Sequence, residues 1–466
     1  MLKSSPDAKW ATDRPGEVAA IRIDIPRKGL VVLAGPAGSG KSTWAARHFA
    51  PEEIVSSDAC RARAGRGESD LAASGPAFAL FYDLIEARLE AGLLVVADST
   101  ALLRTTRQRL LRLARRHELP ATLVIFAATL ETCLKRNASR ARQVPRAVIQ
   151  RHVRQLEELL GRAGEEPFDH VHVIPDDVLL SGGPQVVRVP LAVERPETGP
   201  FDVIGDVHGC FLELVELLER LGYRREDDHF AHPGGRQAVF LGDLTDRGPY
   251  SVSTILLVEA MVAAGTALYV PGNHCRKLYR YLTGRNVVLQ HGIERTVREL
   301  DALPARERQA VARKFCRLYE AAPPYMILDE GRLVVAHAGI KEDMIGRISP
   351  RITNFCLFGD PTGERTPEGL PVRRDWARTY RGEALVVYGH TPVAEAVLRH
   401  NTINIDQGCV FGGRLTALRY PEGEIVQVDA RAPYDPRPLI RPPESFGQDG
   451  EAPISQGAGL ASGPSR

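Results

Sequence analysis

The sequence predicts an α/β protein of two domains, each with a sheet flanked by helices. Its 466 residues exceed what one ordinary hydrophobic core accommodates. Short apolar runs of the buried-strand type recur in both halves and alternate with longer stretches of helical pattern. A Pro- and Gly-rich segment, 181–199, lies between the halves and is expected to be a linker. We therefore expect a first domain over 21–180 and a second over 200–430.

Composition and charge are those of a soluble globular protein. Apolar residues make up 44% and charged residues 25% of the chain, and the net charge is only +2. No overall basic field therefore points to nucleic acid. Eight of the 60 basic residues are lysines and the rest are arginines. This excess of arginine reflects either a coding bias or guanidinium groups that bind phosphates. Only the surroundings of each arginine can distinguish these two interpretations.

The cysteines and the chain ends predict a cytoplasmic protein with reduced thiols and no contact with a membrane. The seven cysteines are odd in number and form no CxxC pair, which argues against a disulfide framework or a structural zinc site. The first residues contain no apolar signal region, and no apolar stretch reaches about 18 residues. Residues 1–20 are expected to be a flexible extension, and the Pro- and Gly-rich residues 431–466 a disordered tail.

The first chemical motif follows the apolar run 30–34. The segment GPAGSGKST, residues 35–43, matches G-x-x-x-x-G-K-[ST] between a predicted strand and a predicted helix. In such a loop backbone N–H groups surround phosphate oxygens, Lys41 reaches the β- and γ-phosphates, and Ser42 holds Mg²⁺. The residues expected to bind ATP are Gly35, Gly38, Ser39, Gly40, Lys41, Ser42 and Thr43. The first domain is therefore expected to be a P-loop NTPase-type parallel sheet with flanking helices; the alternative is a Gly-rich turn without a ligand.

An acidic residue ends the next predicted strand. Asp58 follows the run 54–57, and an aspartate there can accept the proton of an acceptor hydroxyl. Arg61, three residues later, is placed to bind a phosphate of the acceptor. The alternative is that Asp58 only caps the helix that follows. Asp98 ends the strand 93–98 and either supports Mg²⁺ indirectly or belongs, with Ser99 and Thr100, to the cap of a helix over 101–117.

Arginines beyond the fourth strand predict a lid over the bound nucleotide. Arg136 and Arg140 are four residues apart, so in a helix they share one face, and Arg142 lies close by. Such a pair can clamp the phosphates of ATP and stabilise charge in the transition state. The alternative is a solvated arginine face.

The second half repeats one pattern, in which a short apolar strand ends in a possible metal ligand beside a glycine. The residues that follow this pattern are Asp206, His208, Asp243, Asn273, His337, His390 and Asp406. Carboxylates, imidazoles and one amide without thiolates suit Mn²⁺, Fe or Ni²⁺, and Zn²⁺ less clearly. Two metals that share Asp243 would activate water and hold a phosphoryl group.

The motifs GDVHG, GDLTDRG and GNH, with His337 and Gly389-His390, resemble the calcineurin-type binuclear metallophosphoesterase superfamily. The resemblance implies an α/β sandwich in which Asp206, His208, Asp243 and Asp406 hold one metal. It implies a second metal, with Mn²⁺ the first choice for both, on Asp243, Asn273, His337 and His390. It also implies that His274 protonates the leaving oxygen or binds phosphate, and that Arg247 binds phosphate. Cys275 departs from the glutamate common in several branches of that superfamily.

Taken together, GPAGSGKST, SSDACR and VPRAVI followed by this phosphoesterase pattern resemble bacterial polynucleotide kinase-phosphatase over about residues 20–430. The resemblance implies transfer of the ATP γ-phosphate to a 5′-OH end of RNA or DNA. It also implies removal of 3′-phosphate or 2′,3′-cyclic phosphate. In this interpretation Lys41, Asp58, Arg136, Arg140, Arg247 and His274 are catalytic and Arg61 binds substrate.

The ligase that many members of this family carry, marked by Lys-x-Asp-Gly, has no match here. Partners implied are a separate RNA ligase and a 3′-terminal ribose methyltransferase, and the family also suggests a homodimer. Ala101 departs from the asparagine frequent at that position. Two alternatives stay open: a small-molecule or toxin-like kinase fused to a nucleotide or phosphoprotein phosphatase, and a nucleotide-gated regulator with a degenerate phosphoesterase.

Overall fold

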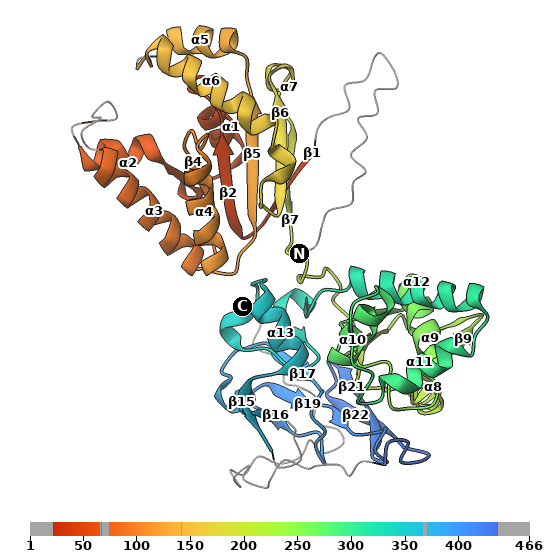
Figure 1. The fold of residues 1–466 in the computed structure, drawn as a ribbon. Helices are drawn as coiled ribbons and strands as arrows, with labels where there is room; N and C mark the ends of the chain where they lie inside the picture. Colours follow the sequence, from red (N-terminus) through yellow and green to blue (C-terminus); the bar gives the residue numbers. More distant parts are fainter. Residues whose placement is uncertain (1–21, 66, 68–73, 141, 367–370, 437–466) are drawn as a thin grey trace. The chain divides into compact units, whose positions relative to one another are not determined.

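The computed structural model describes residues 22–65, 67, 74–140, 142–366 and 371–436. The chain divides into two compact units, Met1–Val189 and Pro190–Arg466. Each unit is an α/β body with its own sheets, as the sequence predicts (Figure 1). The predicted extension 1–20 and the part of the predicted tail after residue 436 lie outside the described residues.

The N-terminal unit is built on a five-stranded parallel sheet. Its strands are, in order across the sheet, β3 (Ile54–Ser56), β4 (Leu94–Asp98), β2 (Gly29–Ala34), β5 (Ala121–Ala127) and β6 (His170–Pro175). All four neighbouring pairs run parallel, so the carboxyl ends of the strands meet at one edge. The β2 strand is buried along its whole length, which explains its uninterrupted apolar sequence.

Helices cover both faces of this sheet. They are α1 (Lys41–His48), α2 (Ser57–Ala64), α3 (Ser74–Glu90), α4 (Arg104–Arg116), α5 (Leu130–Ala138), α6 (Arg146–Leu160) and α7 (Asp176–Leu180), with short 3₁₀ turns at Pro51–Glu53 and Ala163–Glu165. One face packs against apolar side chains of α3, α4 and α6, including Phe81, Leu110 and Leu156. The other packs against Trp44 of α1 and the isoleucines of β1 (Arg22–Pro26).

The predicted linker 181–199 is ordered and belongs to both units. Its first part contains β7 (Gln185–Val189), which pairs in parallel with β1 (Arg22–Pro26) and so closes the N-terminal unit. Its second part joins the C-terminal unit, where Glu194 bridges Ile327. The expected linker therefore contains the division between the two units, and its first part is a strand because pairing with β1 outweighs the local Pro and Gly content.

The C-terminal unit is a sandwich of two sheets. The six-stranded sheet contains β12 (Ala267–Tyr269), β11 (Gln237–Phe240), β8 (Phe201–Ile204), β21 (Arg414–Tyr420) and β20 (Asp406–Gln407) in that order, with β22 (Glu424–Asp429) beside β21. The five-stranded sheet contains β13 (Met326–Leu328), β14 (Leu333–Val335), β17 (Leu385–Tyr388), β19 (Thr402–Asn404) and β18 (Leu398–Arg399). Two hairpins lie outside these sheets, β9 (Arg224–Glu226) with β10 (His229–Ala231) and β15 (Pro361–Arg365) with β16 (Pro371–Arg373).

Three apolar layers hold this sandwich together. Alternate residues of the facing strands, such as Val203, Val239 and Val387, fill the space between the two sheets. The six-stranded sheet is covered on its outer side by helices, and the five-stranded sheet by α13 (Pro350–Phe358) and adjoining loops. The helices of this unit are α8 (Phe211–Arg220), α9 (Ser251–Ala263), α10 (Asn273–Leu282), α11 (Ile293–Asp301), α12 (Ala305–Ala321) and α13 (Pro350–Phe358), with 3₁₀ turns at Asp329–Gly331, Glu342–Met344 and Trp376–Thr379.

Two sequence-based boundaries differ in this unit. The helical sequence pattern over 293–320 forms two helices, because the ring of Pro304 is incompatible with a helix interior, and α12 starts directly after it. The predicted tail begins later than residue 431, because Tyr434 donates a hydrogen bond to Glu213 and the Asp435 N–H donates to the Val410 carbonyl.

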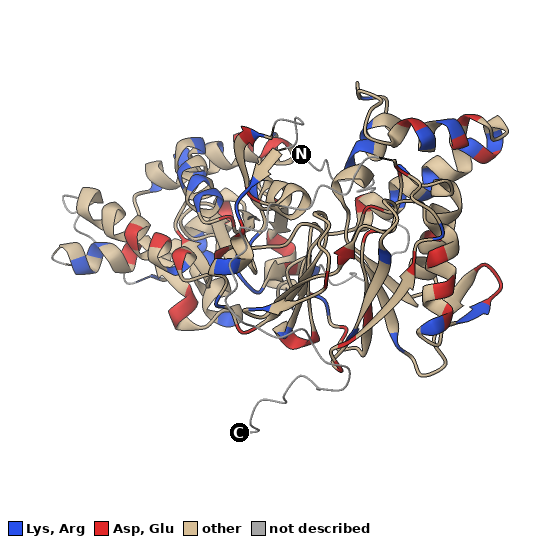
Figure 2. Ribbon diagram, turned by 90° about the horizontal axis from the view of Figure 1, so that it is seen from below, with Lys and Arg blue, Asp and Glu red and all other residues tan. Residues whose placement is uncertain are grey.

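Charge and hydropathy agree with the composition. Basic and acidic residues are interspersed along the helices of both units (Figure 2). Among the described residues no helix combines the length and apolar character that crossing a bilayer requires.

Candidate phosphate-binding loop and metal centre

The N-terminal candidate site begins where β2 ends. The loop that follows turns through Gly38 and Gly40, whose φ angles of +85° and +95° favour glycine, and α1 starts at Lys41. A Cβ at Gly38 would lie 2.5 Å from the Cys133 carbonyl oxygen, so the loop is packed closely against α5. The Lys41 ammonium donates to the carbonyls of Gly35 and Pro36, both at 2.8 Å. The loop thus presents a lysine and a helix N-terminus to one point, which is a phosphate-binding arrangement.

Lys41 and Asp98 share this site. Burial lowers the pKa of Lys41 to about 8, although the carboxylates of Asp98 and Asp58 act in the opposite direction. Burial raises the pKa of Asp98, and a hydrogen bond from Ser42 opposes the shift. Asp98 therefore contacts the residue expected to hold Mg²⁺. The capping alternative for Asp98 is wrong, because α4 starts at Arg104 and its N-cap is Leu103.

Asp58 lies in the first turn of α2 and is not its N-cap. That position belongs to Ser56, whose side chain accepts a hydrogen bond from the Ala59 N–H at 3.5 Å. The Asp58 carboxylate, 55% exposed, accepts hydrogen bonds from Arg61 at 2.5 Å and from Arg142 at 3.3 Å. This carboxylate is exposed to solvent and close enough to Lys41 that its charge acts to raise the pKa of the lysine. It can therefore accept a proton from a hydroxyl group while one of the two arginines holds an adjoining phosphate.

The lid arginines are arranged differently from the prediction. Arg136 lies in α5 and donates to the Ser39 carbonyl of the phosphate loop at 3.2 Å. Arg140 follows the end of α5 at Ala138, so the prediction that both share one helical face is wrong. The Ser139 hydroxyl donates to the Arg136 carbonyl at this helix end. Both arginines nevertheless lie near the loop, since the charge of Arg140 acts to lower the pKa of Lys41 and that of Asp98.

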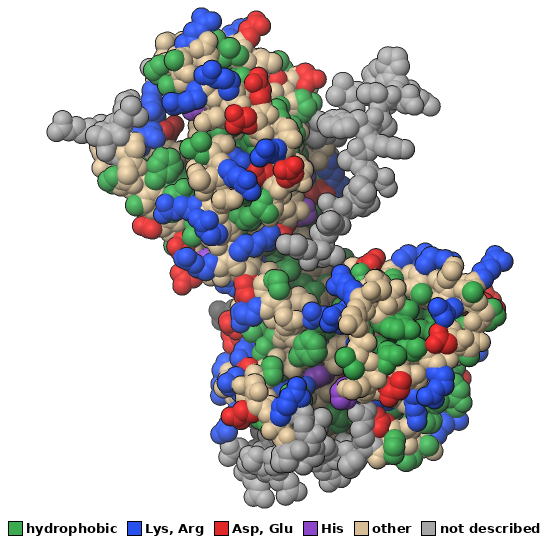
Figure 3. Space-filling model, viewed as in Figure 1, with side chains coloured by type: hydrophobic (Ala, Val, Ile, Leu, Met, Phe, Trp, Pro, Cys, Tyr) green, Lys and Arg blue, Asp and Glu red, His purple; other side chains and the backbone are tan. Residues whose placement is uncertain are grey.

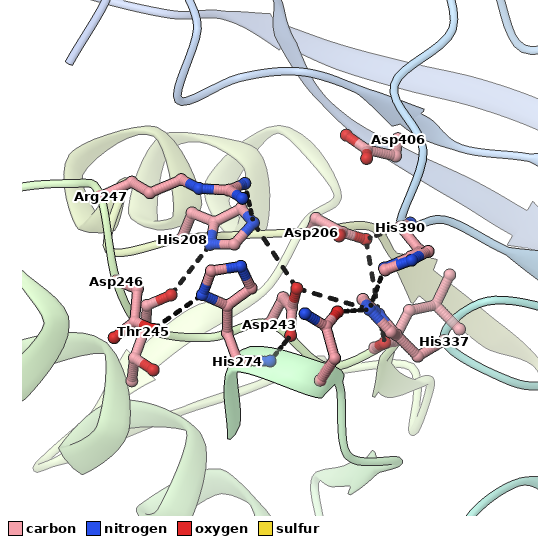
Figure 4. Close-up of polar contacts among 12 residues, drawn as sticks. Asp206, His208, Asp243, Thr245, Asp246, Arg247, His274, His337, His390 and Asp406 are labelled. Atoms are coloured by element: carbon pink, nitrogen blue, oxygen red, sulfur yellow. Dashed lines mark hydrogen bonds and ion pairs between the residues drawn. The ribbon is translucent and has the colours of Figure 1, made fainter. Parts of the chain in front are cut away.

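In the C-terminal unit the predicted metal ligands come together at the strand ends, and Figure 4 shows them around a common centre. Asp206 and His208 follow β8, Asp243 follows β11, Asn273 opens α10 after β12, His337 follows β14, His390 follows β17 and Asp406 opens β20. Two groups of three lie with their ligand atoms within 4.8 Å of one another. The first contains Asp243, His337 and His390, and the second contains His208, Asp243 and His274. Asp243 is common to both, as expected of a bridging ligand.

The first group, together with Asn273, gathers four acceptor atoms. The His337 Nδ1–H donates to the Leu241 carbonyl at 2.9 Å, which leaves the lone pair on Nε2. That Nε2 lies 2.9 Å from Asn273 Oδ1, 3.1 Å from His390 Nδ1 and 3.4 Å from Asp243 Oδ2. Acceptors this close repel one another unless a cation or a proton lies between them. Burial lowers the pKa of His337, but the carboxylates of Asp243 and Asp206 outweigh it and raise the pKa to about 9.

The second group also brings acceptor atoms together. The His208 Nδ1–H donates to the Thr245 carbonyl at 2.9 Å, so its Nε2 is an acceptor, here for the Arg247 guanidinium at 3.1 Å. Burial, and then the charge of Arg247, hold the pKa of His208 well below its usual value, so this imidazole is a neutral ligand.

Asp206 and Asp406 lie on either side of Gly389. A Cβ at Gly389 would lie 2.3 Å from Asp206 Oδ1 and 3.3 Å from Asp406 Cβ. Burial, and then the charge of Asp406, raise the pKa of Asp206 well above its usual value. Burial raises the pKa of Asp406 to about 6. Three buried carboxylates, counting Asp243, are costly without positive charge between them.

Cations fit this donor set. The carboxylates and the imidazole lone pairs face one centre, and His390 Nε2 is buried with no hydrogen-bond partner among the described residues. The seven expected ligands contain oxygen and nitrogen donors only, which favours Mn²⁺ or Fe over a thiolate-type metal. The site therefore suits two divalent ions that share Asp243.

Several residues of this centre have strained backbone conformations. Positive φ angles occur at His208 (48°), Asp243 (37°), Asp246 (76°), Arg247 (69°) and His390 (75°). Each costs free energy in a residue with a Cβ, and such residues persist where the surrounding structure fixes them for a function. The strand-end loops are thus held in conformations that direct their side chains to the centre.

His274 is held by residues that the sequence did not single out for a role. Its Nδ1 lies 2.7 Å from Asp246 Oδ2, and Thr296 of α11 donates to Asp246 Oδ1 at 2.7 Å. The backbone N–H of His274 donates to Asp243 Oδ1 at 2.9 Å. Asp246 lies in the same loop as Asp243, so its place in the sequence could have indicated a role at the site. Thr296 lies in a helix far away in the sequence, and no local pattern marks it.

Comparisons with known proteins agree with this division into two units. The AAA domain model matches residues 30–159, and the calcineurin-like phosphoesterase model matches residues 199–413. The chain is 54% identical over 235 residues to the bis(5′-nucleosyl)-tetraphosphatase PrpE [asymmetrical] of Geobacillus sp. (strain WCH70). That alignment covers 50% of this chain and 96% of the relative. The protein of the same name from Halalkalibacterium halodurans is 56% identical over 233 residues, which cover 50% of this chain and 95% of the relative.

One solved structure, titled as a candidate diadenosine tetraphosphatase, aligns with 51% of this chain and 97% of its own length. Its identity is 24% and its TM-score 0.38, which is too low to support an argument.

Proposed function

The chain belongs to the calcineurin-like phosphoesterase family and also matches the AAA domain model, and we propose that it is an enzyme that heals nucleic-acid ends. In this proposal the N-terminal unit phosphorylates 5′-OH ends with ATP, and the C-terminal unit removes 3′-phosphate or 2′,3′-cyclic phosphate. The observation that carries the proposal is the carboxylate of Asp58, reachable from solvent and held by two arginines close to the phosphate loop. This arrangement suits a hydroxyl acceptor that carries a phosphate of its own.

In the proposed phosphoryl transfer, each of several residues of the N-terminal unit has its own role. The loop N–H groups and Lys41 hold the β- and γ-phosphates, and Arg136 lies over the loop. Asp58 accepts the proton of the 5′-OH as the oxygen attacks, and Arg61 binds the phosphate that adjoins this end. Ser42, supported by Asp98, would hold Mg²⁺, which neutralises charge on the phosphate oxygens when bound.

In the C-terminal unit the proposed hydrolysis uses His274 and Arg247 beside the metal ligands. His274, fixed through Nδ1 by Asp246, gives a proton from Nε2 to the leaving oxygen. Arg247 binds a phosphoryl oxygen at the edge of the centre. Members of this family use divalent metals, which polarise the phosphoryl group and lower the pKa of water when bound. We propose Mn²⁺ as the native metal.

A second candidate function is asymmetrical cleavage of dinucleoside tetraphosphates. The names of the relatives that are 54% and 56% identical favour it. Those relatives, however, align with only about half of this chain. Cleavage of a dinucleoside tetraphosphate does not require a P-loop domain or the carboxylate of Asp58. We therefore favour end healing as the first candidate function. Ligation of the healed ends would fall to a separate RNA ligase, with a 3′-terminal ribose methyltransferase as a further partner, in a cytoplasmic homodimer.

The two functions differ in their substrates, which gives the test. The full chain is assayed for label transfer from ATP to a 5′-OH oligoribonucleotide, and for phosphate release from an RNA 3′-phosphate and cleavage of diadenosine tetraphosphate. End healing predicts both RNA reactions, with transfer abolished by Asp58→Ala and release abolished by Asp243→Asn. Rapid cleavage of diadenosine tetraphosphate with no reaction at either RNA end would establish the second function instead.

A further inference from the structure

Three side chains beside the metal centre have no part in the mechanism above. Arg276 lies in α10 three residues after Asn273 and therefore on the same face of that helix. Phe358 is the last residue of α13, and Arg373 lies in β16. We call these three residues the rim cluster. They come from three separate elements and were not expected from the sequence to act together.

The rim cluster is attached to the loop that holds His337. The backbone N–H of Ala338, the next residue, donates to the Cys356 carbonyl in the last turn of α13 at 2.7 Å. A Cβ at Gly359 would lie 3.5 Å from Arg373 Cδ and 3.9 Å from the Ala338 carbonyl oxygen. The end of α13 thus lies between Arg373 and the metal loop, and α10 brings Arg276 from the side of Asn273.

The three side chains contact one another. The Arg276 Nη1–H donates to Asn354 Oδ1 at 2.6 Å, and its guanidinium carbon lies 5.8 Å from the centroid of the Phe358 ring. The Arg373 Nε–H donates to the Phe358 carbonyl at 2.9 Å. Phe358 is 37% exposed, which is unusual for a large aromatic side chain, so its ring is available to a ligand.

Neither arginine of the rim cluster has a carboxylate within ion-pair distance in the described part of the chain. Their neighbours differ, because Lys341 and Arg374 both pair with Asp360, at 2.6 and 3.2 Å. Burial lowers the pKa of Arg373. Two guanidinium groups without a counter-ion, one of them partly buried, are suited to an anion from a ligand. Figure 3 shows histidine side chains reaching the surface of this unit beside hydrophobic and basic side chains.

We propose that the rim cluster binds the nucleotide part of the substrate next to the scissile phosphate. The base stacks on Phe358, and Arg276 and Arg373 bind the phosphate that adjoins this nucleoside. This inference rests on the proposed function, in which the substrate is a phosphate ester of a nucleotide. The adjoining phosphate belongs to an RNA strand or to a polyphosphate chain, and both sources present the same base and anion.

The test compares substrates with and without the nucleotide part. In the full chain, Phe358→Ala and Arg276→Ala should each raise KM for an RNA dinucleotide 3′-phosphate or for diadenosine tetraphosphate about 10-fold, the order of one base stack or phosphate contact. The substrate with the larger effect identifies the source of the anion. The kcat/KM for glycerol phosphate, which lacks a base and a second phosphate, should change less than about 2-fold. Phe358→Trp should restore the wild-type KM, because tryptophan also stacks.

Matched variants control for the removal of an exposed side chain. Leu256 has the same exposure of 37% on α9, and Arg280 follows Arg276 by one turn of α10. Leu256→Ala and Arg280→Ala should leave both substrates unaffected. An equal loss on glycerol phosphate and on nucleotides, or no loss with nucleotides, would overturn the proposal.

Binding measurements separate this inference from the proposed function. Titration calorimetry with adenosine 3′-monophosphate should show affinity about 10-fold weaker in Phe358→Ala than in the wild type, while inorganic phosphate binds both equally. This result is expected even if the wild-type chain hydrolyses none of the substrates, in which case the proposed function alone fails. Equal affinities of both proteins for the nucleotide contradict the rim cluster as a nucleotide site.

Discussion

The substitution Gly272→Ala should displace Asp243, the ligand that both groups of the metal centre share. Gly272 is the N-cap of α10 with φ −98°, an angle that alanine adopts freely, so the backbone offers no obstacle. The obstacle is space, because a Cβ there would lie 2.1 Å from Asp243 Oδ1 and 2.5 Å from its backbone nitrogen. Ordinary contact begins near 3.4 Å, so the Asp243 carboxylate must move by about 1 Å.

A displacement of about 1 Å at a group that organises the reaction costs about 100-fold in rate. We therefore expect kcat/KM for phosphate release from the preferred nucleotide substrate to fall about 100-fold, and the divalent metal content per chain to fall with it. Steady-state kinetics and plasma mass spectrometry measure the two quantities. Phosphate transfer by the N-terminal unit, measured on the same preparation, should be unchanged and reports that the chain is folded.

Gly265→Ala is the matched control. Gly265 has φ +75°, which strains alanine, but no other atom of the described part of the chain lies within 4 Å of its Cβ position. It should therefore lower stability slightly and leave phosphate release intact. If Gly272→Ala keeps wild-type activity and metal content, Asp243 does not organise the centre and the steric reasoning is refuted.

Three further predictions concern the base, the core and the metals. Asp58→Ala should lower 5′-phosphorylation by about 10² to 10⁴-fold and leave phosphate release unchanged, as label transfer and phosphate assays report; equal losses in both would show that the units are not independent. Asp202→Ala should destabilise the C-terminal unit by about 3 kcal/mol, because Asp202 is fully buried and accepts hydrogen bonds from the buried Arg236 guanidinium at 3.0 Å. Without Asp202 this guanidinium keeps the half-exposed Glu422 and the carbonyls of Phe201 and Tyr420, but loses its fully buried carboxylate. Calorimetry should show one lowered transition; a shift in both would contradict that assignment. Dialysis against a chelator should abolish phosphate release, and Mn²⁺ should restore it, whereas activity that survives removal of divalent metal would exclude the proposed centre.

The parts that the sequence predicted well are local. The phosphate loop is a single run of residues between a strand and a helix, and the loop forms where that run predicts it. The metal ligands are separated by long stretches of chain, but each is marked by its own strand end and glycine. Because the carboxyl ends of parallel strands meet at one edge of a sheet, these local sequence patterns were enough to predict that the ligands converge.

The parts that the sequence missed depend on distant contacts. Thr296 reaches Asp246 from a helix 50 residues away in the chain, and nothing in its neighbourhood marks it. The pairing of β1 with β7 joins segments more than 150 residues apart, which turned an expected linker into a strand. The rim cluster likewise combines two helices and a hairpin strand. The end of α5 before Arg140 is a boundary of a few residues, the scale at which sequence patterns are least decisive.

The central claim, that one chain heals both ends of a broken strand, is tested most directly by a single time course. The full protein is incubated with ATP, Mg²⁺ and Mn²⁺ and one RNA that bears both a 5′-OH and a 2′,3′-cyclic phosphate, and each end is followed separately. We predict that the product carries a 5′-phosphate and a free 3′ end, and that Asp58→Ala and Asp243→Asn each block only one of these changes. An RNA that keeps both original ends, with ATP or diadenosine tetraphosphate consumed instead, would contradict the claim.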